Sequence, residues 1–238
     1  MRACRLAFLG LGLAILASPA QAQAELPPLP PDTTAARYGT SAAVAFLLTE
    51  YGLGAGLAGR TRLTDDLSVA VELAVGAGRD EREQEFFFDP FESEIPLKRH
   101  YVLLAPLRIG VERRLFRRAV EDNFRPFLHA ALGPTLGLQW PYFDDLDGDG
   151  RRDLETEATL GVFDRLGDAE PRLGVGGTVA MGAAVGRGRS MLSFRFGVSA
   201  DVFPVPVELL EVSPEVESPS RRAFWTPVVT FHVGRLAP

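Results

Sequence analysis

Four aspartates, spaced two or four residues apart, form the segment of this sequence best suited to chemistry. It reads Asp145-Leu146-Asp147-Gly148-Asp149-Gly150-Arg151-Arg152-Asp153, with carboxylates at positions one, three, five and nine. This spacing lets their oxygens converge on one centre, and the glycine at position six permits the sharp turn that calcium loops need. The sequence predicts a Ca²⁺ loop. The alternative is a solvated acidic turn without an ion, because surface loops are often rich in Asp and Gly.

The same segment resembles the nine-residue calcium loops of FG-GAP-type repeats and the first part of an EF-hand. The resemblance implies side-chain ligands and one backbone carbonyl ligand, which would be Asp145, Asp147, Asp149 and Asp153, with the carbonyl of Arg151. At position twelve the bidentate glutamate of an EF-hand is replaced by Thr156, between Glu155 and Glu157. A complete EF-hand is therefore not expected, and a bound ion would serve to make a long loop rigid, with modest affinity.

The N-terminus predicts export. Arg2 and Arg5 precede an apolar run from Leu6 to Leu16, and small residues fill positions 17–24. This order is typical of a secretory signal peptide, and the apolar run is too short to span a bilayer. We expect a signal peptide over residues 1–24 and, over residues 25–37 with their four prolines, a periplasmic leader that joins neither a sheet nor a helix.

Composition excludes several classes of function. Cys4 is the single cysteine and lies in the expected signal peptide, so the mature chain offers no disulfide, thiolate or cysteine-ligated zinc. Without Arg2 and Arg5 it carries 23 basic against 31 acidic residues, a formal charge of −8, which gives no electrostatic reason to bind nucleic acid.

From residue 38 onward the chain divides into eight segments of about ten residues with a two-residue period. That is the length and rhythm of a tilted membrane-spanning strand. The expected strands are Thr40 to Leu48, Leu53 to Leu63, Leu67 to Val75, Tyr101 to Val111, Phe127 to Leu138, Leu173 to Val185, Leu192 to Val202 and Trp225 to Leu236. They predict one all-β domain over residues 38–238, an eight-stranded antiparallel up-and-down transmembrane β-barrel.

The connections between these strands support a membrane barrel. If the first strand runs outward, the short turns near 64–66, 115–123 and 187–189 fall on the inner side, and the long segments 78–99, 139–171 and 204–222 fall outside. Long outer loops and short inner turns are characteristic of outer-membrane barrels. The first outer connection, 49–52, is a short exception. A soluble barrel or sandwich is the alternative, and it leaves this asymmetry unexplained.

The face opposite the apolar one predicts a filled lumen. It carries many small residues, such as Gly174, Gly176, Ala180 and Gly182, which suit the cramped interior of an eight-stranded barrel. Its charged side chains are expected to pair inside the lumen, since a buried charge is tolerated when it is matched. The expected pairs join Arg60, Arg62, Arg108 and Arg195 with Glu72, Glu112 and Asp201.

Residues 124–133, Phe-Arg-Pro-Phe-Leu-His-Ala-Ala-Leu-Gly, resemble a strand opening of OmpA-like and OmpW-like outer-membrane barrels. With the signal peptide and the hairpin plan, the mature chain is similar to this superfamily of small barrels. The resemblance implies a protein of the Gram-negative outer membrane, in contact with its lipid. Such barrels usually end on an aromatic residue, whereas this chain ends Ala237-Pro238 and its last aromatic is Phe231.

The expected function is non-enzymatic: a structural or surface-interaction role for an extracellular partner that the sequence does not identify. One alternative is a narrow porin-like channel for small solutes. The other is a lipid hydrolase, in which His129 would approach Ser193 or Ser199, with Glu72 or Asp201 nearby. A histidine held in the polar network of the lumen is the simpler interpretation.

Two aromatic clusters lie in the long outer segments. Phe86, Phe87, Phe88 and Phe91 are expected to pack their loop over the barrel mouth, with an interfacial girdle or an adhesive patch as alternatives. A second group, at the start of the next long loop, is expected in the aromatic girdle at the membrane surface. Its members are Trp140, Tyr142 and Phe143.

Overall fold

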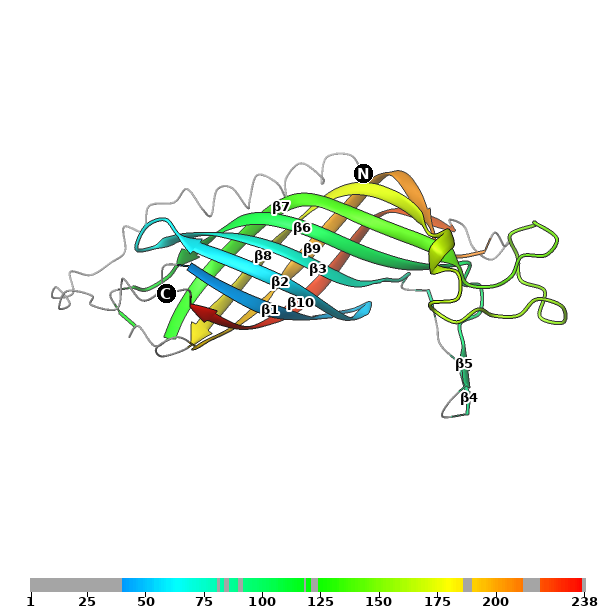
Figure 1. Cartoon of the computed structure of the whole chain (residues 1–238), viewed down its shortest axis with the longest axis horizontal. Coiled ribbons are helices and arrows are strands. Elements are labelled where there is room, and N and C mark those ends of the chain that lie inside the picture. Colours follow the sequence, from blue (N-terminus) through cyan, green and yellow to red (C-terminus); the bar gives the residue numbers. More distant parts are fainter. Residues whose placement is uncertain are drawn as a thin grey trace.

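Eight antiparallel strands close into a ring in the computed structural model (Figure 1). It describes residues 40–80, 82–83, 86–89, 92–117, 119–120, 124–185, 190–211 and 219–236. The ring strands are β1 (Thr40–Thr49), β2 (Gly52–Arg62), β3 (Leu67–Gly78), β6 (His100–Arg114), β7 (Phe124–Pro141), β8 (Glu170–Val185), β9 (Ser190–Glu208) and β10 (Ser220–Leu236). Three short elements lie outside the ring: β4 (Phe86–Asp89), β5 (Glu92–Glu94) and the 3-10 turn η2 (Leu166–Asp168).

The ring is closed by its first and last strands. Each strand pairs with its sequence neighbours in the ring, and β1 also pairs with β10, from Ser41 opposite Leu236 to Thr49 opposite Val228. The predicted all-β, eight-stranded up-and-down barrel is confirmed. Among the described residues, no helix is long and apolar enough to cross a membrane.

The strands show the inverted faces of a membrane barrel. On β9, Ser193 and Arg195 point into the lumen and are buried, while Leu192, Phe194 and Phe196 point outward with about half of their surface exposed. The other ring strands likewise carry exposed large apolar side chains on their outer face. A protein in water would bury these side chains, whereas lipid solvates them, so this exterior is built for hydrocarbon.

Small residues make the interior fit, as predicted. A β-carbon on Gly176 would meet the carboxylate of Asp201 and the guanidinium of Arg108, and one on Gly182 would meet the backbone and side chain of neighbouring β9. Gly174 and Ala180 are buried on the same face. The glycines of β8 therefore leave the space that the lumenal charges occupy.

The two ends of the barrel differ as the connections predicted. One end carries the tight turn at residues 63–66 and the connection at 115–123; we call the other the outer end. It carries the long connections between β3 and β6, β7 and β8, and β9 and β10, and also the short β1–β2 turn. Several ring strands run beyond their predicted outer limits, β9 to Glu208 and β7 to Pro141. The expected signal peptide, the leader and the turn at 187–189 lie outside the described residues.

The first long connection contains a small hairpin of its own. β4 and β5 pair antiparallel and project sideways from the outer end of the barrel (Figure 1). Phe86, at the start of β4, is half exposed. The expectation that this aromatic cluster packs over the mouth is therefore wrong at Phe86, and the side chains of the other three phenylalanines lie outside the described part of the chain.

Candidate functional site

Three of the predicted calcium ligands come together. Carboxylate oxygens of Asp145, Asp147 and Asp149 lie within 4.8 Å of one another on an exposed turn. Gly150 adopts a φ of +73°, a conformation that other residues rarely take, as the sharp turn required. The turn is already ordered by its own hydrogen bonds, since Asp145 accepts from the backbone N–H groups of Gly148 at 2.8 Å and Gly150 at 3.0 Å. Three converging carboxylates suit a hard divalent cation.

The remaining predicted ligands are arranged differently. The carboxylate of Asp153 accepts hydrogen bonds from the backbone N–H of Glu155 and the hydroxyl of Thr156, at 3.0 and 2.9 Å. Glu157 is buried and closes the loop, because its carboxylate accepts from the backbone N–H groups of Leu146 and Asp153 at 2.6 and 3.0 Å. The roles of Asp153 and of the Arg151 carbonyl as ligands stay predictions.

The lumen holds three ion pairs among the charged residues that the sequence predicted to pair there, and the Arg108–Asp201 pair is buried on both sides. Arg60 contacts Glu112 at 3.0 Å, and two further pairs cross the interior, Arg195 with Glu72 and Arg108 with Asp201. Arg108 also donates to the carbonyls of Gly133 and Pro134 at 3.1 Å and to the hydroxyl of Thr135 at 3.0 Å. The fourth arginine differs: Arg62 pairs with Asp65 in the inner turn, because it stands at the last residue of β2.

The histidines do not form the arrangement that a hydrolase requires. His129 is buried, its Nδ1 lies 3.7 Å from Glu112, and neither ring nitrogen has a hydrogen-bond partner among the described residues. His232 contacts Arg195 and lies 3.3 Å from Glu72, so it belongs to an ion-pair network. Ser193 lies directly opposite His232 in the β9–β10 pairing and lines the same lumenal pocket, but no serine hydroxyl hydrogen-bonds either ring in the described part of the chain. Both histidines occupy the lumenal network that the simpler interpretation assigned to them.

An apolar plug closes the outer mouth of the lumen, and sequence reasoning missed it. Its buried side chains come from β6, β9, β10 and the loops: Tyr51, Val102, Leu104, Phe203, Val207, Leu209, Leu210 and Phe224. The chain after β9 crosses the mouth, where the N–H of Arg99 donates to the carbonyl of Leu209 and the N–H of Glu211 to that of Leu97, both at 2.8 Å. The apolar residues in and before the outer connection between β9 and β10 were the available signal.

A buried cluster of charged side chains links the first long connection, between β3 and β6, to β10 at the outer end of the barrel. Lys98 and Glu83 form an ion pair at 2.7 Å with almost no exposed side-chain surface. Beside it, burial acts to raise the pKa of Asp80, but hydrogen bonds from Arg82 and the charge of Arg221, 2.7 Å away, outweigh burial and hold that pKa below its ordinary value. The cluster joins residues from three separate segments of the outer end.

The aromatic side chains expected in the girdle are buried instead. Trp140, Tyr142 and Phe143 are each 5% exposed or less. The indole N–H of Trp140 donates to the carbonyl of Val162 at 2.8 Å, because the loop between β7 and β8 folds down over the outer face of β7. The prediction of a lipid-facing girdle was therefore wrong for these three. Trp225 on β10 does face outward, with 58% of its surface exposed.

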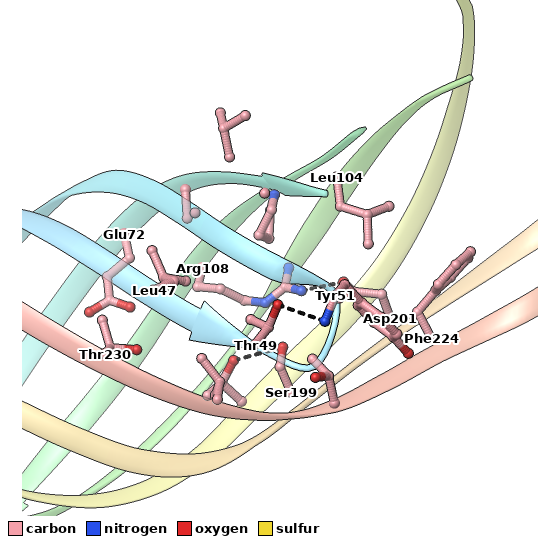
Figure 2. A pocket seen from close by; sticks show the side chains of 18 of the residues that line it. Leu47, Thr49, Tyr51, Glu72, Leu104, Arg108, Ser199, Asp201, Phe224 and Thr230 are labelled. Atoms are coloured by element: carbon pink, nitrogen blue, oxygen red, sulfur yellow. Dashed lines mark hydrogen bonds and ion pairs between the residues drawn. The ribbon is translucent and has the colours of Figure 1, made fainter. Parts of the chain in front are cut away.

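A cavity of about 100 Å³ lies beneath the plug (Figure 2). It is lined by the Arg108–Asp201 pair, by the hydroxyls of Ser199 and Thr230, and by apolar side chains such as Leu47 and Leu104. The labelled side chains converge on it from strands all around the ring (Figure 2). The lumen is therefore interrupted at two levels, by apolar packing at the mouth and by paired charges below.

No family model matches the chain. No curated protein matches it either. Solved structures of small barrels are similar in fold. Neisserial surface protein A is 11% identical over 83% of this chain and 94% of its own, with a TM-score of 0.39. The N-terminal β-barrel domain of OprF from Pseudomonas aeruginosa is 11% identical over 82% of this chain and 96% of its own, with a TM-score of 0.34. Ail, the attachment invasion locus protein of Yersinia pestis, is 14% identical over 83% of this chain and 94% of its own, with a TM-score of 0.35.

Proposed function

We propose that this protein resides in the outer membrane of a Gram-negative cell as a non-conducting, non-enzymatic barrel that holds an ordered surface for extracellular contact. The observation that carries the proposal is the combination of a lipid-compatible exterior with a lumen closed by the plug and by paired charges. A barrel sealed in this way offers solutes no continuous path, so its activity belongs to the outer loops.

The placement in the membrane follows from the exterior. Outward-facing residues such as Leu57 and Leu132 are about two thirds exposed. Burying such a side chain in hydrocarbon stabilises the membrane-inserted state by roughly 1.5–3 kcal/mol. Labelling of intact cells with a membrane-impermeant maleimide tests the orientation, because the mature chain is expected to lack cysteine. Phe163→Cys on the long outer loop should react and Asp66→Cys at the inner turn should not; the reverse pattern contradicts the orientation.

Electrical recording tests the closed lumen. In planar lipid bilayers the purified barrel should give no conductance steps under moderate salt. A porin-like channel remains the competing proposal, and the polar groups that line part of the cavity below the plug are the observation that favours it. Steady single-channel conductance from the wild-type protein would decide for the channel.

The acidic turn is proposed to bind Ca²⁺ and to stabilise the loop between β7 and β8. Support comes from the three converging carboxylates and the left-handed Gly150. Calorimetric titration with Ca²⁺ should give one site of modest affinity that Asp147→Ala abolishes. Asp168→Ala, on the same loop but outside the turn, should leave the titration unchanged. Equal titrations for the wild type and Asp147→Ala would remove the site.

A further inference from the structure

A short segment at the end of β9 and just beyond it runs across the outer mouth, and we call these residues, 207–211, the strap. Leu209 and Leu210 of the strap belong to the plug and are almost fully buried. The chain just before β6 holds the strap along one side. Lys98 forms an antiparallel bridge with Leu210, and the N–H of Arg99 donates to the carbonyl of Leu209 at 2.8 Å. The plug therefore depends on how firmly the strap lies against this segment.

Arg99 also joins the strap to the long loop between β7 and β8. Its guanidinium pairs with Glu208 of the strap at 2.8 Å. The same guanidinium is covered by Gly150, which is buried and belongs to the acidic turn, residues 145–153. A β-carbon on Gly150 would lie 3.0 Å from the Cζ and Nη2 atoms of Arg99, so the turn can lie this close only because the residue has no side chain.

A second contact joins the turn to the strap at Glu211. The carboxylate of Glu211 is buried and accepts a hydrogen bond from the backbone N–H of Arg152. Burial raises the pKa of this carboxyl above its ordinary value, and the charge of Asp149 adds to the rise, while the hydrogen bond and the charges of Arg152 and Arg151 oppose it. The closed strap thus carries the cost of a buried carboxylate, and the turn supplies the groups that offset part of it.

Backbone strain adds to the cost of the closed strap. Leu97 adopts a φ of +61°, a conformation that a bulky residue rarely takes. Its carbonyl accepts the N–H of Glu211 at 2.8 Å, so the strained residue is one of those that hold the strap. Strain of this kind persists where surrounding contacts fix it, and at the strap these include the two contacts from the acidic turn.

The acidic turn has two sides. Three carboxylates are exposed on it, while Gly150 and Arg152 contact Arg99 and the strap. The buried carboxylate of Glu157 spans the turn, because it accepts from the N–H groups of Leu146 and Asp153. A turn braced in this way moves as one unit, so a displacement on its exposed side reaches both points that hold the strap.

We propose that the acidic turn is a latch that holds the strap in the mouth of the barrel, so that displacing the turn from outside releases the plug. The inference rests on the closed lumen and the surface-contact role proposed above, and the experiment separates it from them. A partner that moves the turn then changes the mouth as well as the loop, which couples surface contact to the lumen.

Two glycine variants with similar backbone strain test the latch. Gly150 and Gly148 have φ values of +73° and +75°, so leucine is unfavourable to a similar degree at either position. A β-carbon at Gly148 meets nothing within 4 Å, whereas one at Gly150 meets Arg99. Only Gly150→Leu should therefore push the turn away from Arg99 and the strap.

Amide hydrogen exchange, followed by NMR in lipid nanodiscs, gives the readout. The N–H groups of Arg99 and Glu211 bond between the strap and the chain before β6. Both should be protected in the wild type and in Gly148→Leu, and both should lose protection in Gly150→Leu. The amides of the membrane-spanning strands should stay protected in all three proteins, which shows that the barrel remains folded.

A double variant identifies Arg99 as the point of contact. Arg99→Ala makes room for the new side chain, so adding Gly150→Leu to it should not speed exchange at Glu211 any further. Additive effects, or equal exchange in the two glycine variants, would overturn the latch and leave the closed lumen in place. Loss of protection along the wall would also overturn it, because the turn would then support the whole barrel. Rapid exchange at both amides in the wild type would count against the closed lumen itself.

Discussion

Removing the charge of Asp201 should destabilise the barrel far more than removing an exposed carboxylate. Asp201 and Arg108 are both less than 10% exposed, and Asp201 also accepts from Thr135. Asp201→Asn keeps the shape of the side chain but leaves the Arg108 charge without its counterion. Breaking a buried pair in this way costs about 3–5 kcal/mol.

The structure places the expected cost at the lower end of that range. Arg108 keeps three oxygen acceptors, on Gly133, Pro134 and Thr135, after the substitution. We therefore expect a loss of about 3 kcal/mol, which corresponds to roughly a hundredfold change in the folding equilibrium.

Urea unfolding in phospholipid vesicles, followed by tryptophan fluorescence, measures this loss. The control Glu170→Gln breaks an exposed pair with Arg172 and should cost about 1 kcal/mol or less. Adding Arg108→Met to Asp201→Asn removes the orphaned charge and should restore most of the stability. Equal midpoints for Asp201→Asn and Glu170→Gln would refute the reasoning, because the lumen would then be hydrated at this level.

Three further changes probe other parts of the molecule. Lys98→Met removes the nearer of the two cations beside the buried carboxylate of Glu83 and leaves Arg79 at 3.5 Å, so limited proteolysis of the outer loops should become faster than in the wild type. Gly110→Ala drives a β-carbon into the backbone of β7 and should sharply reduce folding yield, whereas Gly59→Ala, in open space, should fold as the wild type does. Asp80 has a lowered pKa, so the stability that its ion pairs give to the outer end is complete above its ordinary pKa of 3.8 and is lost as the pH falls through the lower, folded-state pKa. Protease resistance of the wild type should therefore fall on acidification below pH 3.8. In Asp80→Asn it should not change over the same pH range.

Alternation along the chain was sufficient to predict the barrel. Each strand obeys the two-residue period in its membrane-facing part, since hydrocarbon outside and a crowded lumen inside both act on every residue there. The same logic placed Arg60, Arg108 and Arg195 in the lumen. It could not assign the partner of Arg62, because at the end of β2 the adjacent turn supplies a nearer carboxylate, that of Asp65.

The outer end was harder to predict, because loop contacts replace periodicity there. By the two-residue alternation Trp140 should point outward into lipid, yet the loop that carries Val162 covers it. Phe203, Leu209 and Leu210 lie in or beyond the outer part of β9, close to or within the predicted outer connection, and they pack into the mouth. The calcium-type turn was recognisable since its geometry is local, and its φ-positive glycine followed from the spacing alone.

The seam between β1 and β10 has a consequence for assembly. Until residues 220–236 have been made, both β1 and β9 present rows of unpaired backbone groups, each of which costs several kcal/mol in hydrocarbon. A partly formed sheet is therefore unstable within the bilayer. Entry into the membrane and closure of the ring must then occur as one event, directed by the last segment of the chain, and a chain shortened by this single strand should leave no inserted product.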